Sequence, residues 1–226
     1  LFKEVFGSDA FADPDRAFKH IGEAIAAFER TPAFQPFSSK YDAWLAGRAR
    51  LTLQEQRGLK LFEREDKGNC AACHPVARDS RGRGGLGTDF TYDNLGVPKN
   101  PDNPFYRLPE AYDPVGRNFV DRGLGGVVGQ AGEYGKFKVP TVRNVELTAP
   151  YMHNGYFSSL RAVVDFYNTR DAKPRCDEEF VAEAEAVARG CWPRPEMVAN
   201  VNSDELGHLR LSAREVDDIV TFMLTL

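Results

Sequence analysis

The chain has 226 residues, of which 42% are hydrophobic and 27% are charged, and its formal net charge is −4. These values are ordinary for a globular protein, and the length is enough for one domain or one and a half. The weak negative charge gives no indication of binding to nucleic acid or to an anionic membrane, and no apolar run reaches the roughly twenty residues that span a bilayer.

The N-terminal segment predicts an amphipathic helix over residues 14–30. Asp13 can cap it, Pro14 suits the first helical position, and Pro32 lies just beyond its end. Its apolar side chains recur at helical spacing on one face and are Phe18, Ile21, Ile25 and Phe28. The chain begins at Leu1 and not at Met, so we expect it to be a processed or truncated piece of a longer protein.

A second helix is expected between Thr52 and about Glu63, because Thr52 and Glu55 have the spacing of a capping box. After it, the segment from Val76 to Gly135 carries twelve of the twenty glycines and five of the fourteen prolines, with little periodicity. An irregular stretch of this length is typical of a chain that wraps a ligand, since glycine lets the backbone approach a flat group closely.

The segment between these two contains Cys70-Ala71-Ala72-Cys73-His74, the C-x-x-C-H pattern of covalent haem attachment. Cysteines at this spacing can form thioethers with two vinyl groups of a porphyrin, and His74 can then give an axial nitrogen to the iron. A zinc site would need two more ligands at short spacing, but the other cysteines lie about a hundred residues away. A thioredoxin-like dithiol would need βαβ flanks, which are missing. The motif predicts one covalent haem c.

Ordered patterns return after residue 136. Residues 137–145 include Arg143, which can pair with a haem propionate. Residues 150–155 predict a tight turn that contains Met152 and His153. A helix is then expected from a cap at Ser158 or Ser159 to about Tyr167, and a last helix from a capping box of Ser212 and Glu215.

Residues 172–208 form a polar excursion in which Met197 and His208 are expected to have no role at the iron. The same segment contains Cys176 and Cys191, which are candidates for a disulfide, with two free thiols as the alternative. Because disulfides persist outside the reducing cytosol, this use of cysteine and the haem motif together indicate an exported protein, most economically a periplasmic one.

Taken together, these segments resemble the bacterial di-haem cytochrome c peroxidase family, which includes MauG. Beside the haem motif, the resemblance rests on AIAAFERT at 24–31, GLKLF at 58–62, GKFKVPTVRN at 135–144, APYMHNG at 149–155 and LRAVVDFYN at 160–168. It implies a mainly α fold: a cytochrome c-like haem domain with long irregular Gly/Pro-rich loops and an extra N-terminal helix.

Members of this family have two cytochrome c domains, each with its own C-x-x-C-H motif, and the motif here matches the second. The resemblance implies that residues 1–31 are the closing helix of a preceding domain absent from this chain, and that residues 32–226 form a c-type cytochrome domain. In the family the first haem reacts with peroxide, and the second takes electrons from a carrier protein. This segment is therefore expected to relay electrons and to contain no catalytic residue of its own.

The second axial ligand of the iron is expected to be Tyr167 or Met152. A thioether sulfur raises the potential of a haem, whereas a phenolate stabilises ferric iron and lowers it. In the peroxidases the ligand methionine ends a helix that resembles Leu160 to Tyr167, and MauG-like members have tyrosine at that place. The resemblance therefore favours Tyr167, with Met152 as the alternative.

Two classes of function remain open. The first is the electron-input domain of a di-haem peroxidase or of a MauG-like enzyme that oxidises a protein. The second is a stand-alone monohaem electron carrier, which would have no use for the apolar face of the helix at 14–30. The resemblance also implies a small electron-donor protein (cytochrome c or cupredoxin), a second haem domain and a homodimer as partners. It further implies a calcium ion held by backbone oxygens around Lys138 to Pro140.

Overall fold

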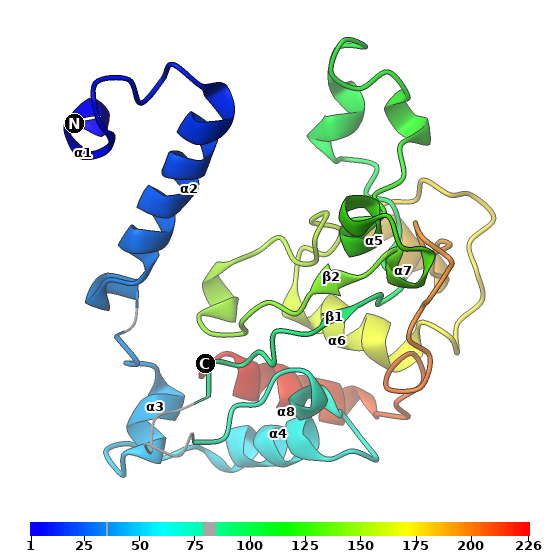
Figure 1. The fold of residues 1–226 in the computed structure, drawn as a ribbon. Helices are drawn as coiled ribbons and strands as arrows, with labels where there is room; N and C mark the ends of the chain where they lie inside the picture. Colours follow the sequence, from blue (N-terminus) through cyan, green and yellow to red (C-terminus); the bar gives the residue numbers. More distant parts are fainter. Residues whose placement is uncertain (35, 79–84) are drawn as a thin grey trace. The chain divides into compact units, whose positions relative to one another are not determined.

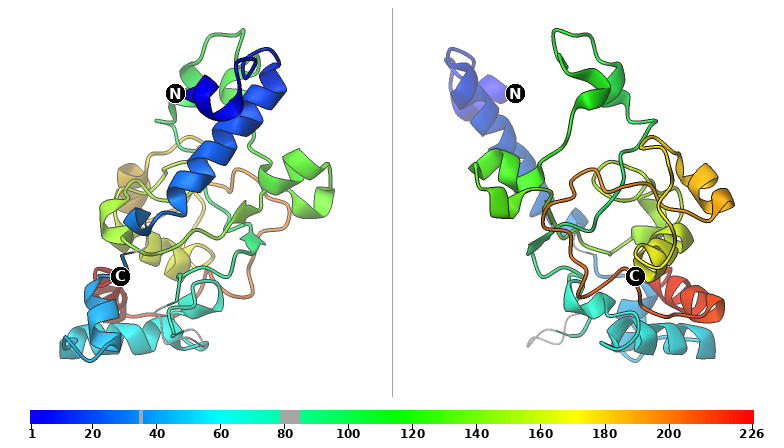
Figure 2. Two further views of the ribbon diagram at one scale, coloured as in Figure 1. Left: turned by 60° about the vertical axis from the view of Figure 1, so that its left-hand side comes forward. Right: turned by 90° about the vertical axis from the view of Figure 1, so that its right-hand side faces the viewer.

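The computed structural model in Figures 1 and 2 describes residues 1–34, 36–78 and 85–226. By contacts within the chain it divides into two compact units, Leu1–Ser38 and Ser39–Leu226. As expected, the fold is mainly helical, with a single two-stranded sheet in the described part of the chain. None of the helices in these ranges is both long enough and apolar enough to cross a membrane.

The first unit contains α1 (Phe2–Phe6), α2 (Pro14–Glu29) and the short 3-10 helix η1 (Pro32–Phe34). The carboxylate of Asp13 accepts a hydrogen bond from the Arg16 amide at 3.0 Å, as an N-cap should. The four apolar residues of the expected face are all exposed, and the exposed fractions lie between 44% for Ile21 and 79% for Phe18. This helix therefore presents an apolar face that the unit itself does not bury.

The second unit contains six α-helices among the described residues, connected by short 3-10 turns and long irregular segments (Figure 1). Its helices are α3 (Lys40–Leu45), α4 (Leu53–Glu63), α5 (Gly123–Val128), α6 (Leu160–Thr169), α7 (Glu183–Arg189) and α8 (Ala213–Met223). The strands β1 (Tyr92–Asp93) and β2 (Phe137–Lys138) pair antiparallel, with Tyr92 opposite Lys138.

Helices α4 and α8 form the base of this unit and lie side by side in both figures. Each begins with the expected capping box, Thr52 with Glu55 and Ser212 with Glu215. Their close contact requires Gly58, because a Cβ there would lie 1.9 Å from the carbonyl oxygen of Asp218. The core between them is aromatic and aliphatic, and its most deeply buried members are Phe62, Ile219 and Phe222.

A second core lies around α6, which begins after its Ser159 cap and ends two residues beyond the expected limit. Phe157 and Phe166 each pack edge to face with Trp192 here, and none of the three is exposed to solvent. Cys176 and Cys191 form the expected disulfide next to this cluster, with their Cα atoms 5.2 Å apart.

The polar excursion contains one regular element that the sequence pattern did not predict, helix α7. Its N-cap position is Ala182, and it runs for only two turns before Gly190 ends it in the left-handed conformation. Among its residues only Ala186 is buried, so the helix has no apolar stripe.

Candidate haem site

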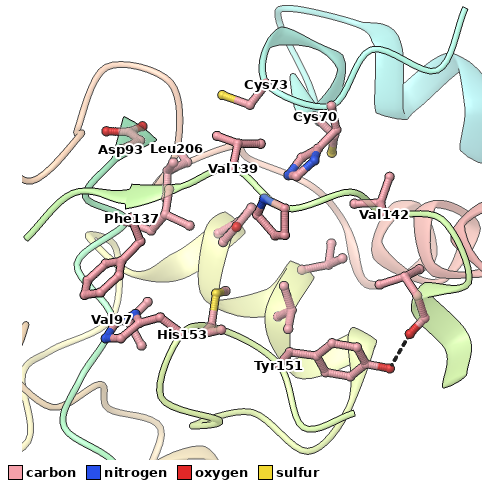
Figure 3. Close-up of a pocket in the computed structure, with 18 of the residues that line it drawn as sticks. Cys70, Cys73, Asp93, Val97, Phe137, Val139, Val142, Tyr151, His153 and Leu206 are labelled. Atoms are coloured by element: carbon pink, nitrogen blue, oxygen red, sulfur yellow. Dashed lines mark hydrogen bonds between the residues drawn. The ribbon is translucent and has the colours of Figure 1, made fainter. Parts of the chain in front are cut away.

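A cavity of about 390 Å³ lies in the second unit (Figure 3). Its size is that of a small-molecule site, and its wall is mostly apolar. Residues far apart in the sequence meet in it, from the haem motif, from β1 and β2, from the turn at 150–153 and from α6. In Figure 3, Cys70 and Cys73 lie along one edge, and Tyr151 and His153 lie along the opposite one.

The haem motif forms the short helix η2 (Cys70–Ala72), which follows Asn69 in the left-handed conformation at φ 52°. The amide of His74 donates to the carbonyl oxygen of Cys70 at 2.8 Å, so one turn brings the cysteines and the histidine to the same cavity. Both cysteines are free thiols. Burial raises the pKa of Cys70 to about 12, and burial with nearby carboxylates raises that of Cys73 to about 11.

The imidazole of His74 has a fixed orientation. Its Nδ1 lies 2.8 Å from the carbonyl oxygen of Gly87, and because a carbonyl only accepts, Nδ1 must carry the proton. The lone pair is then on Nε2, which is the nitrogen that binds metals in such arrangements. Burial holds the pKa of His74 below its ordinary value, which favours this neutral form.

Both candidates for the second axial ligand line the same cavity, Tyr167 from α6 and Met152 from the turn before it. Met152 has a positive φ of 71°, which is unusual for a residue other than glycine. Within the described part of the chain, no hydrogen bond involves the hydroxyl of Tyr167. Burial raises the pKa of Tyr167 above its ordinary value of 10.0, so without a metal its phenol stays protonated.

Some residues of the cavity wall were not predicted from the sequence. Met197, which is expected to have no role at the iron, lines the cavity beside Gly135, and its expected lack of a role at the iron stays a prediction. His153 stacks on Phe137 with ring centroids 3.6 Å apart, and its Nε2 lies 3.8 Å from a carboxylate oxygen of Glu196. Met197, His153 and Glu196 come from loops, so no periodicity marks them.

Arg143, the expected partner of a haem propionate, is not among the described residues that line the cavity. Its guanidinium forms an ion pair with Asp42 of α3 and donates to the carbonyl oxygen of Gly85 at 3.1 Å. The guanidinium therefore joins α3 to the loop that follows the haem motif. The role at a propionate stays a prediction that this geometry does not favour.

The residues present fit a haem. Two free thiols at C-x-x-C spacing, a neutral histidine with its proton on Nδ1 and a phenol without a hydrogen bond in the described ranges converge on one apolar cavity. A divalent metal alone fits less well, since no group of three or more His, Cys, Asp or Glu side chains in the described ranges has a metal-binding arrangement. Fold and site together define a cytochrome c-like domain.

Comparison with known proteins narrows this class. No protein-family model matches the chain. It is 35% identical over 228 residues to the methylamine utilization protein MauG of Paracoccus denitrificans, covering 100% of this chain and 55% of that protein. It is 33% identical over 180 residues to the cytochrome-c peroxidase IdrP1 of Denitromonas iodatirespirans, covering 74% of this chain and 44% of that protein.

The structure is similar to that of the diheme peroxidase BthA from Burkholderia thailandensis. The TM-score is 0.74 at 33% sequence identity, and the match covers 99% of this chain and 54% of the other. The chain thus spans about half the length of the relatives it matches. It belongs to the haem-containing family of MauG and the di-haem cytochrome c peroxidases.

Proposed function

We propose that this chain is the electron-input haem domain of a periplasmic di-haem oxidoreductase of the cytochrome c peroxidase type. The observation that carries the proposal is the convergence of Cys70, Cys73, His74 and Tyr167 on one apolar cavity. A haem c there would supply a one-electron iron couple. The chain's own part is to hold the porphyrin by two thioethers, to orient the proximal imidazole and to exclude water with the apolar wall.

Tyr167 is the proposed distal ligand. A buried phenol needs a polar partner, its hydroxyl has none in the described ranges, and a metal ion favours the ionised form that burial alone opposes. Met152 is the alternative, and Met197 is a further thioether in the same wall. A phenolate would give a low reduction potential and a thioether a higher one.

The proposed organisation places residues 1–31 at the end of a preceding haem domain and residues 32–226 in the electron-input domain. Its support is the exposed apolar face of α2, which a stand-alone electron carrier would not need, and the half-length match to the relatives. The proposed partners are that second haem domain, a small electron-donor protein such as a cytochrome c or a cupredoxin, and a second copy in a homodimer. A calcium ion held by carbonyl oxygens around Lys138 to Pro140 is part of the same proposal.

The substrate of the whole enzyme is peroxide in this proposal. The second candidate is a MauG-like enzyme that oxidises a protein, and the 35% identity to MauG over the whole chain favours it. Two assays of the intact native protein with hydrogen peroxide separate the candidates, one with a reduced carrier protein as electron donor and one with a protein substrate whose oxidation is followed by mass.

Haem attachment is tested on the native protein produced with a haem-ligation system. The haem of this domain should stay with the polypeptide in acidified organic solvent, and the Cys70→Ala/Cys73→Ala variant should lose one haem by mass. Haem that is extracted from the unmutated protein, or an unchanged mass in the variant, would disprove the proposal.

The distal ligand is tested with a matched pair of variants. Tyr167→Phe should change the spin state of the ferric haem and raise its potential, whereas Met152→Leu should change neither. The far-red band of sulfur-to-iron charge transfer should be missing from the unmutated protein. Its presence there would assign the position to a methionine instead.

A further inference from the structure

Asn202 contacts two carboxylates with one amide group. Its Nδ2 donates to Asp93 Oδ2 at 2.5 Å and to Glu205 Oε2 at 2.6 Å. A neutral amide thus keeps two negative charges close together, an arrangement that Coulomb repulsion opposes.

The side chain of Asn202 is oriented by its surroundings. Its Oδ1 accepts the backbone amides of Asp204 and Glu205 at 3.1 Å, so its Nδ2 must face the carboxylates. Its backbone is held on both sides, since its amide donates to Asn94 and its carbonyl oxygen accepts from Arg170 at 2.7 Å. These hydrogen bonds together fix the orientation of the Asn202 side chain.

Among the described residues, neither Asp93 nor Glu205 forms an ion pair with lysine, arginine or histidine. The buried Arg170 pairs with Asp171, and the ammonium of Lys138 lies 4.7 Å from the ring of Phe90.

Both carboxylate residues belong to the wall of the haem cavity, which Cys73 also lines. Asp93 comes from β1, and Glu205 comes from the loop that leads to α8. Figure 3 shows Asp93 beside Leu206 at one end of the cavity. A cofactor bound there would experience both charges.

We infer that Asn202 is a positioning residue that holds Asp93 and Glu205 against the haem cavity, where their negative charge keeps the reduction potential of the haem low. The inference rests on the proposed function, because it requires a haem in this cavity. Negative charge near the iron stabilises the ferric over the ferrous state, and salt screens the part of the effect that passes through solvent. It acts in the same direction as a phenolate from Tyr167.

The test measures the reduction potential of this haem in the intact holoprotein by spectroelectrochemical titration. The Asp93→Asn/Glu205→Gln variant, which keeps the shape of both side chains, should raise the potential, by an amount that shrinks as the salt concentration rises. Asn202→Leu should raise it less, because the released carboxylates move toward solvent. Asp204→Asn is the matched control, since Asp204 is exposed, as Glu205 is, but does not line the cavity, and it should leave the potential unchanged.

Each contrary outcome has a distinct meaning. Absence of a covalent haem would overturn the proposed function and this inference together. A haem whose potential is the same in the double variant and in the unmutated protein would overturn this inference alone. An unchanged potential in Asn202→Leu would remove the positioning role of Asn202. If calcium chloride raised the potential of the unmutated protein but not of the double variant, the carboxylates would be a cation site, and the inference would fail.

Discussion

The Nδ1 of His74 lies 2.8 Å from the carbonyl oxygen of Gly87, thirteen residues further along the chain. This hydrogen bond sets the tautomer and the rotation of the proximal imidazole, and it depends on the path of the backbone at Gly87. Gly87 has a φ of 66°, and a Cβ there would lie 2.7 Å from a methyl carbon of Val142. Both features require glycine.

We therefore expect Gly87→Ala to lower the free energy of unfolding by about 1–3 kcal/mol. The haem spectrum should change as well, because the imidazole loses its orientation. Gly132→Ala is the control, since its Cβ would meet nothing within 4 Å, and it should cost less than about 0.5 kcal/mol. Urea unfolding and visible spectra of both variants measure the difference, and equal effects would contradict the prediction.

The disulfide between Cys176 and Cys191 closes a loop with a sequence separation of 15. Chain-entropy reasoning gives a stabilisation of about 3 kcal/mol for a loop of this size. Cys176→Ser/Cys191→Ser should lower the free energy of unfolding by about that amount, measured from the fluorescence of the buried Trp192 during urea unfolding. The unmutated protein treated with reductant should behave like the variant, and no change in either case would refute the estimate.

Arg143 and Asp42 form a mostly buried ion pair, with side chains 16% and 6% exposed. The second oxygen of Asp42 has no hydrogen-bond partner in the described ranges, so removal of the arginine would leave a buried carboxylate poorly compensated. Arg143→Met should therefore cost about 3 kcal/mol of stability. Asp42→Asn/Arg143→Met should cost less than the single variant. If the two losses were simply additive in a double-mutant cycle, the pair would not be coupled.

Arg57 of α4 holds Asp218 of α8 through two hydrogen bonds, at 2.9 and 3.1 Å. The hydrogen bond from Arg57 lowers the pKa of Asp218 below its ordinary value of 3.8. The pKa of Asp218 is thus lower in the folded state than in the unfolded state. The contribution of this carboxylate to stability is therefore complete at pH values above the unfolded-state pKa of 3.8, and it is lost as the pH falls through the folded-state pKa.

Asp218→Asn should accordingly lower the free energy of unfolding at pH 7. The difference in this free energy between the variant and the unmutated protein should become smaller as the pH falls below 3.8. Urea unfolding across this pH range measures the trend. Asp217→Asn is the matched neighbour, with a side chain that is 53% exposed, and it should show little effect at any pH. A loss in Asp218→Asn that stays constant with pH would exclude this linkage.

The sequence alone was sufficient for features that depend on local spacing. The C-x-x-C-H motif, the capping boxes at Thr52 and Ser212 and the apolar stripe of α6 are all local patterns, and the structure contains the helices that they predict. The two cysteines of the polar excursion also form the disulfide that their segment suggested. In each case the determining contacts lie within one or two turns of chain or within one loop.

Only the tertiary structure decided which distant residues share the cavity. Met197 and Glu205 come from a polar loop without periodicity, and their places depend on contacts with Gly135 and Asn202. Arg143 is a second example, because its ion pair with Asp42 joins positions about a hundred residues apart, and no local pattern predicts that contact. Loop positions follow from long-range packing and hydrogen bonding, and such contacts leave no periodic signal in the sequence.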